Sequence, residues 1–454
     1  MKRIFSLLIF LGLPAWLFAQ LDSFNLAAYK LPDIKTQKLD FSLAGDGLNY
    51  FNYQVNGSDT TKNNDARFHG NFGATYSLFR NRADYQGEQY ASLSFNSINS
   101  TQDTRKQRST EVNLSVRSTN RAYFNKGLFL QYGIIMSDAL NFNYHTRFEL
   151  TPVKGFGNSM TAMVPLLIGK GRIEPVQDAR LAVYILEDLI KTGSISRIPD
   201  QEEIMEFARL ISATKNKRFF DSRIKRIWEI EMIDAWLQSR NFLTKTDATY
   251  FTRLYDNWIY SSGPVRESGK RFSAGFEPEI YADVHSTFIS GDTAGSSRED
   301  HQSYTLRAVI RHEKANPINL YWQSGHLLEL AGLRVLDDPA NDWYTQLTGR
   351  IQYSWGWFPN SRTNMDISVN LAGDYYGPDV TVESGELSYF VFYPDIRYSF
   401  YYYISPELRL TIDYNGSYSL FGERRDPLIP PFIKYRSGHA LQQSLSLKIS
   451  YSLF

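Results

Sequence analysis

The segment from Phe272 to Phe288 shows the clearest pattern of hydrophobic and polar positions in the chain. Its even positions are mostly apolar, while Glu277, Glu279, Asp283 and His285 stand at odd positions. This alternation predicts a β-strand with one apolar and one polar face. Strands of soluble sandwiches usually have about five or six residues, whereas a tilted strand needs about 9–11 residues to cross the hydrocarbon of a bilayer. We therefore interpret the segment as a membrane-spanning strand with its apolar face toward lipid and its charged face toward a polar lumen.

Alternating segments recur from residue 40 to about 170 and again from about 263 to the end of the chain. They predict about six strands in residues 20–170 and about eight in residues 263–454. The total of about fourteen is even, as is usual in bacterial transmembrane barrels. A closed antiparallel barrel is also the one strand-based structure that pairs every backbone group in lipid. The sequence thus predicts a mainly β fold, a transmembrane antiparallel β-barrel.

The connections and one glycine-rich stretch add detail to this barrel. Short connections are expected near 314–318, 357–361 and 403–406, and longer ones near 290–300, 374–387 and 420–440. Such alternation of short turns and long loops is typical of outer-membrane barrels. The apolar phase changes at Gly45-Asp46-Gly47, which predicts a bulge or a kink in the first strand.

Residues 171–262 interrupt the strands with helical periodicity. Pro175 suits the first turn of a helix, and Asp200 with Glu203 predicts a capping box at the start of a second helix. Four amphipathic helices are expected, which indicates an α-helical domain inserted into the barrel. With the N-terminus of the barrel inside, the sixth strand descends, so the insert is expected to face the periplasm.

The ends of the chain and its composition indicate where the protein is located. Residues 1–19 have two early cations and an apolar run, which predicts a secretory signal peptide cleaved near Ala19/Gln20. The absence of cysteine excludes a lipidated N-terminal Cys, disulfides and thiolate sites. A balance of 49 basic and 48 acidic residues gives no cationic surface for nucleic acid, so no nucleic-acid partner is expected.

With its signal peptide, alternating strands and last residues Tyr451-Ser-Leu-Phe454, the chain resembles the outer-membrane β-barrel proteins of Gram-negative bacteria. The resemblance implies outer-membrane lipid and the barrel-insertion machinery as partners, with Tyr451 and Phe454 in the assembly signal. The stretch from Gly169 to Leu186 also resembles a junction in Bacteroidota-type barrels that carry helical inserts. These resemblances imply a fold and a location but no substrate.

The polar positions of the strands supply the candidate site residues. The expected pore-lining residues are Glu277, Glu279, Asp283, His285, Arg307, Arg311, Arg350, Asp366, Asp395, Arg397, Arg409 and Asp413. Their mixed charges fit either an unselective aqueous channel or a salt-bridged, closed interior, since a selective pore would favour one sign. No metal or cofactor pattern is present, so none is expected, and Gly169-Lys-Gly-Arg172 lacks the spacing of a nucleotide-binding loop.

Three functions remain open at this point. The first is a channel for small polar solutes with a periplasmic helical domain. The second is a membrane-anchored structural or assembly protein whose helical insert docks a periplasmic protein. The third is a barrel hydrolase that uses Asp283 and His285, for which the sequence assigns no nucleophile; we therefore expect no enzymatic activity.

Overall fold

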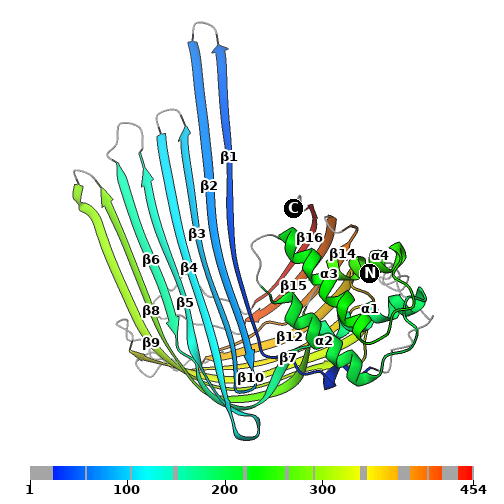
Figure 1. Cartoon of the computed structure of the whole chain (residues 1–454). Helices are drawn as coiled ribbons and strands as arrows, with labels where there is room; N and C mark the ends of the chain where they lie inside the picture. Colours follow the sequence, from blue (N-terminus) through cyan, green and yellow to red (C-terminus); the bar gives the residue numbers. More distant parts are fainter. Residues whose placement is uncertain are drawn as a thin grey trace, which may run out of the picture.

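A computed structural model describes residues 24–451 except 57–58, 103–104, 147–151, 218–221, 261–264, 290–291, 338–344, 377–388, 406–407 and 422–437. The predicted signal peptide and Phe454 lie outside the described residues. Figure 1 shows a long, curved antiparallel sheet with a group of helices near one end of its strands.

The strands before the helices are β1 (Ile34–Asn56), β2 (Asp59–Arg82), β3 (Tyr85–Gln102), β4 (Arg105–Phe124), β5 (Leu128–His145), β6 (Val153–Met163) and β7 (Leu166–Pro175). The helices are α1 (Gln177–Lys191), α2 (Gln201–Lys215), α3 (Ser222–Ser239) and α4 (Ala248–Ile259), with the single turns η1 (Leu26–Ala28) and η2 (Asn125–Gly127) elsewhere in the chain. The later strands are β8 (Glu267–Ile289), β9 (Asp292–Pro317), β10 (Trp322–Asp337), β11 (Thr345–Trp357), β12 (Thr363–Tyr376), β13 (Tyr389–Phe392), β14 (Asp395–Tyr403), β15 (Leu408–Phe421) and β16 (Gly438–Tyr451).

The sixteen strand segments form fourteen ribbons, because two ribbons are each interrupted at a proline. Segments β6 and β7 both lie between β5 and β8 and are separated at Val164-Pro165. Segments β13 and β14 both lie between β12 and β15 and are separated at Tyr393-Pro394. Proline has no N–H to give to a ladder, so a break there is expected. Six ribbons thus precede the helices and eight follow them.

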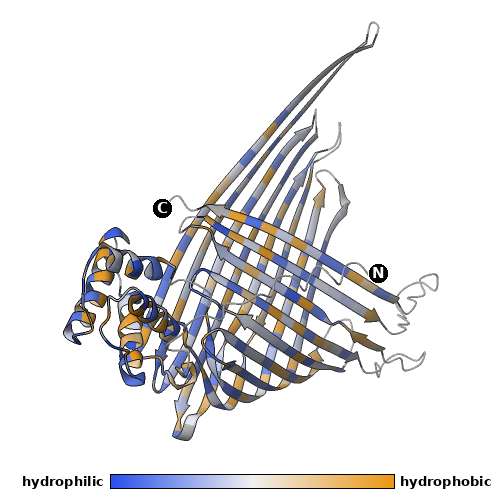
Figure 2. Cartoon of the chain, turned by 90° about the vertical axis from the view of Figure 1, so that its right-hand side faces the viewer, coloured by the Kyte–Doolittle hydropathy of each residue, from blue (hydrophilic) through white to orange (hydrophobic). Residues whose placement is uncertain are grey.

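The outer face of the sheet is apolar along ribbon after ribbon. In β8, Phe272, Phe276 and Phe288 are 48%, 55% and 53% exposed, whereas Glu277 on the other face is 4% exposed. Figure 2 shows the same alternation of hydrophobic and hydrophilic positions along the other strands. So many exposed large apolar side chains are unfavourable in water and favourable in lipid.

The expected fold class, a transmembrane antiparallel β-barrel with an inserted helical domain, is confirmed in strand order, apolar outer face and helical insert. The two end ribbons, β1 and β16, each have one neighbour in the described sheet, β2 and β15 respectively. The described sheet therefore has two edges, and Figure 1 shows that it is curved.

The larger hydrophobic core lies in the helices, and only a small buried cluster of Leu167, Val309 and Ala331 lies in the sheet. Helix α1 packs against α2 and α4, and α3 packs against α2. Leu186, Phe207, Leu237 and Leu254 are fully buried there. The segment before β1 completes this core, since Phe24, Leu26, Tyr29 and Leu31 are also buried in it. We call residues 24–33 the N-terminal arm and the four helices the helical domain.

Three local expectations are wrong. Strand β1 pairs with β2 without a register shift from Ile34 to Asn56, so no bulge forms at residues 45–47; a Cβ on Gly45 or Gly47 would meet the partner strand at ordinary contact distance. Pro175 ends β7 and α1 begins at Gln177, because Pro175 still pairs with Glu267 in the sheet. Residues 292–300 are the start of β9, since their backbone pairs with β8 in spite of their polar side chains.

The capping box at α2 is confirmed and predicts a pH effect. Asp200 accepts a hydrogen bond from the Glu203 N–H, and the Glu203 side chain accepts one from the Asp200 N–H. The Arg197 guanidinium also bonds the Glu203 carboxylate at 2.8 and 2.5 Å, and chiefly for this reason the pKa of Glu203 is lowered to about 2. A lowered pKa adds stability above the unfolded pKa, and this stability is lost as pH falls toward 2.

In Glu203→Gln we expect the helical domain to lose about 0.5–1 kcal/mol at pH 7, since the amide keeps the cap but loses the ion pair. Chemical unfolding followed by helical circular dichroism measures this loss. The difference from the unsubstituted protein should shrink as pH is lowered from about 4.5 toward 2. A difference that stays constant over this range would contradict the assignment.

Candidate functional site

The inner face of the sheet carries a network of four charged side chains from three neighbouring ribbons. Arg307 and Arg311 of β9 lie between Glu277 of β8 and Glu329 of β10. Arg307 bonds both carboxylates, with 2.6 Å to Glu329. Arg311 bonds Glu329 at 2.6 Å and lies 3.7 Å from Glu277. The two cations are therefore matched by two anions.

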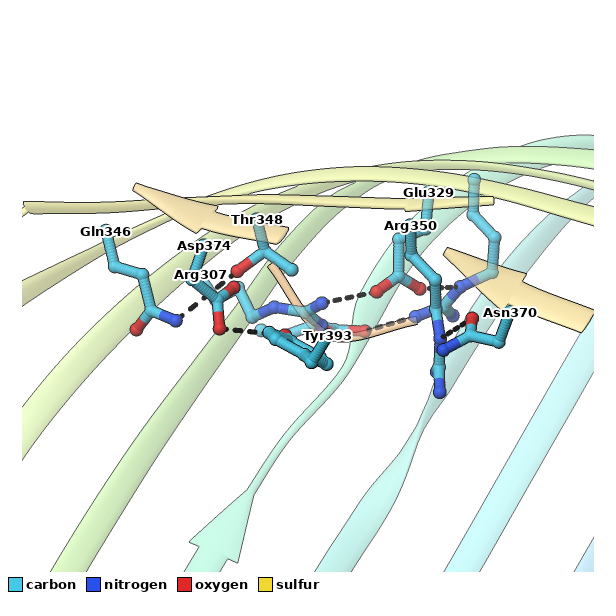
Figure 3. A network of polar contacts seen from close by, with 10 residues as sticks. Arg307, Glu329, Gln346, Thr348, Arg350, Asn370, Asp374 and Tyr393 are labelled. Atoms are coloured by element: carbon cyan, nitrogen blue, oxygen red, sulfur yellow. Dashed lines mark hydrogen bonds and ion pairs between the residues drawn. The ribbon is translucent and has the colours of Figure 1, made fainter. Parts of the chain in front are cut away.

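A second network continues on the next ribbons (Figure 3). Arg350 of β11 donates to the Asn370 carbonyl oxygen on β12 at 3.0 Å, and the Asn370 amide donates to Asp395 of β14 at 2.7 Å. Asp395 also pairs with Arg397 at 3.1 Å. Nearby, the Tyr393 hydroxyl donates to Asp374 at 2.7 Å. These contacts join neighbouring ribbons or near residues of one ribbon, so the charged groups lie along the wall of the sheet.

The structure places the twelve expected lumen residues on six strands: Glu277, Glu279, Asp283 and His285 on β8; Arg307 and Arg311 on β9; Arg350 on β11; Asp366 on β12; Asp395 and Arg397 on β14; Arg409 and Asp413 on β15. Of those outside the two networks, Asp413 accepts from Ser399 at 2.7 Å, Asp366 accepts from Asn364 at 2.7 Å, and the Arg409 guanidinium lies 5.4 Å from the Tyr401 ring centre. Glu329 and Asn370 are not among the twelve expected residues. Each of them bonds two of the expected residues and so completes one of the two networks.

Asp283 and His285 meet as the hydrolase hypothesis requires, with 2.9 Å between the carboxylate and Nε2. His285 is largely exposed and neighbours Gly157 across the ladder. Ser159 is the ladder neighbour of Asp283, yet in the described part of the chain no hydroxyl bonds the imidazole. Within the same described residues, no group of three acidic or histidine side chains is placed to hold a metal ion.

A cavity of about 590 Å³ separates the helical domain from the inner face of the first ribbons. Glu88 and Arg117 line it from the sheet, Asp178 and Lys215 from the helices, and Glu267 from the start of β8. Asp178 accepts from Lys215 at 2.9 Å and from Ser212 at 2.5 Å. Sequence reasoning did not find this cavity, because it depends on how the helices and the sheet meet.

The helical domain contacts the short-turn end of the sheet on both sides of the cavity. On the side of the first ribbons, Thr36 of β1 donates to Asn216 after α2. On the side of the later ribbons, the Tyr184 hydroxyl donates to the Phe358 carbonyl at 2.7 Å, and Arg362 bonds Asp256. The helices therefore cover this end of the sheet.

Arg266 is the most deeply buried of these connecting side chains, at 0% exposure. It donates to the carbonyls of Asn319 and Leu320 in the turn between β9 and β10, and to the Trp322 carbonyl and the Gln323 side chain at the start of β10. Its guanidinium also lies 4.9 Å from the Phe358 ring centre. One side chain thus links the segment after α4 to two turns of the sheet.

Among the described residues, no helix is both long enough and apolar enough to span a bilayer. A comparison with protein families finds no match for the sequence, and a comparison with curated proteins finds none either.

Several solved structures are similar to this chain at low identity. One is the translocator domain of the autotransporter NalP from Neisseria meningitidis, with 7% identity, coverage of 76% of this chain and 84% of that chain, and a TM-score of 0.31. Another is OmpT, an outer membrane protein of Vibrio cholerae, with 7% identity, coverage of 94% and 99%, and a TM-score of 0.27. A third is OpdQ of Pseudomonas aeruginosa, with 6% identity, coverage of 91% and 97%, and a TM-score of 0.22. At these TM-scores the similarities carry no argument about function, which rests on the geometry of the chain itself.

Proposed function

We propose that this chain is an outer-membrane β-barrel protein that lets small polar solutes pass through its lumen, with the helical domain at the periplasmic mouth. The proposal rests on how the inner charged side chains pair with one another along the wall of the sheet. Glu277, Arg307, Arg311 and Glu329 bond one another along the wall. Such an arrangement leaves a polar, neutralised wall and keeps the side chains out of the passage.

The cavity beside the helical domain gives this passage an exit. It is lined by both signs of charge, as the wall of the sheet is. A mixed lining favours small polar or zwitterionic solutes over ions of one sign. The helical domain then narrows the passage at the short-turn end and sets the size of solute that leaves.

Conductance across a planar bilayer tests the proposal. We expect discrete conductance steps from the purified protein with weak ion selectivity. In Glu329→Gln, two arginines lose their shared anion, so the ratio of anion to cation permeability should rise several-fold. Glu206→Gln, which makes the same change on the surface of α2, should leave selectivity unchanged. A sealed bilayer with correctly inserted protein would overturn the channel function.

A further inference from the structure

The first two turns of α3 expose apolar side chains together with cations. Ile224 and Ile227 are 51% and 55% exposed, and Arg223 and Arg226 are exposed on the same turns. Most large apolar side chains of the domain form its core, whereas these two isoleucines are exposed, as Ile198 is elsewhere in the domain at 54%. We call residues 223–228 the basic face of α3.

The adjacent helix extends this surface. Phe251 and Tyr255 of α4 are 43% and 40% exposed, and Arg226 donates to the Tyr255 hydroxyl at 3.2 Å. The contact shows that the two helices present their exposed aromatic and aliphatic groups on neighbouring surfaces. The result is an apolar strip bordered by guanidinium groups.

Only part of the charge of this region serves the helix itself, through the ion pair of Lys225 with Glu229 one turn further on at 3.6 Å. Residues 217–228 contain five lysines and arginines and one aspartate. Helix α3 has no acidic residue in its first turn. Cations near a helix N-terminus face the positive end of the helix dipole, which costs each of them a few tenths of a kcal/mol. Beyond the contacts of Lys225 with Glu229 and of Arg226 with Tyr255, the excess of positive charge at this end of the helix suits an anionic surface outside it.

The basic face lies beside the C-terminal part of α4, which contacts the sheet through Asp256 and Arg362. The C-terminal part of α4 runs beside it, since the Trp258 indole donates to Glu229 at 2.8 Å. Just beyond, the Tyr260 ring lies 5.1 Å from the ring of Tyr403, the last residue of β14. Tyr402 beside it is 39% exposed on the outer face. Tyrosines at strand ends mark the level of the lipid headgroups in transmembrane barrels.

We propose that the basic face of α3 lies on the periplasmic leaflet of the same membrane and binds the headgroups of anionic phospholipids. Isoleucine and aromatic side chains would enter the headgroup boundary while lysine and arginine pair with lipid phosphates, as interfacial amphipathic helices do. The contact holds the helical domain in a fixed orientation against the barrel mouth. The proposal goes beyond solute passage and does not depend on it.

A single label tests this contact in the full-length protein, because the chain contains no cysteine. Ile227→Cys carries an environment-sensitive fluorophore, and the protein is reconstituted in nanodiscs of phosphatidylcholine with or without phosphatidylglycerol. We expect a blue shift and protection from iodide quenching that increase with phosphatidylglycerol. Removing two cations by Arg223→Gln with Arg226→Gln should weaken the contact about thirtyfold, at about fivefold per cation.

The matched control removes two cations from the segment that follows α3, by Arg240→Gln with Lys245→Gln. Both side chains are about half exposed there and pair with Glu206 and Asp247. This variant should keep the response to phosphatidylglycerol. A label that stays open to iodide in every lipid would overturn the proposal, as would equal loss in the two double variants. Protection that requires an added periplasmic protein fraction would assign the face to a protein partner instead and would also overturn it.

Discussion

Replacing Arg266 by alanine should release the helical domain from the later ribbons of the sheet. The substitution leaves the carbonyls of Leu320, Asn319 and Trp322 without their buried donor and removes the guanidinium from the Phe358 ring. Hydrogen bonds to a charged group contribute about 1.5–3 kcal/mol each, so the loss should exceed about 3 kcal/mol. Limited trypsin digestion of the reconstituted protein should then cleave residues 177–259 far faster, while the sheet stays resistant.

Two further variants distinguish the hydrogen bonds of the planar Arg266 guanidinium from the effect of its charge. Arg266→Lys keeps the charge but not the planar fork, so we expect cleavage between that of the alanine variant and that of the unsubstituted protein. Arg240→Ala removes an exposed guanidinium just after α3 and, apart from the loss of cleavage at residue 240 itself, should leave digestion unchanged. If Arg266→Ala were digested as slowly as the unsubstituted protein, Arg266 would not hold the domain.

In the membrane, β1 and β16 should pair with each other and close the barrel. Each unpaired backbone group in hydrocarbon costs several kcal/mol, so two free edges cannot persist there. Leu39 and Leu43 of β1 and Leu445 and Ile449 of β16 are exposed apolar positions. A one-residue slip would put the two apolar sets on opposite faces. The register that places Asp40 opposite Lys448 keeps them together and joins opposite charges, whereas a slip by two residues places Lys38 opposite Lys448.

Paired cysteines measure this register. Ser42 would face Ser446, so the double variant Ser42→Cys, Ser446→Cys should form a disulfide in high yield on oxidation and keep the barrel compact in denaturing gels. The displaced pair Ser42→Cys, Gln442→Cys should not, because cysteines more than about 7 Å apart at Cα cannot be bridged without movement of the backbone. A reversed outcome would show another register, and crosslinking in neither variant would show that the two ribbons do not pair.

The alternation of apolar and polar residues explains why most of the strands could be predicted from the sequence. The alternation in Phe272–Phe288 depends on each strand having one face in lipid and one in water, so it persists wherever a ribbon crosses the bilayer. It therefore located the ribbons on both sides of the helices. It also placed Glu277 and Arg307 on one face, but not as partners, because partners depend on register between ribbons and not on the pattern within one.

The sequence did not reveal features that arise where different parts of the chain meet. The interruptions at Pro165 and Pro394 were missed because the apolar pattern continues across them. The polar start of β9 was read as a loop because alternation is lost once a strand leaves the hydrocarbon. The N-terminal arm and Arg266 pack against helices that are distant in sequence, and no local pattern marks such contacts.

The hairpin of β1 and β2 is much longer than a bilayer requires, and Figure 1 shows it rising beyond the other strands. Its strands have 23 and 24 residues, whereas about 9–11 cross the hydrocarbon, so roughly 40–50 Å of paired chain extends past the lipid. If the helices face the periplasm, as we propose, this extension stands outside the cell. It would then be the part of the molecule that antibodies, phage or neighbouring cells meet first, and a protease added to living bacteria could trim it while the remaining ribbons stay in place.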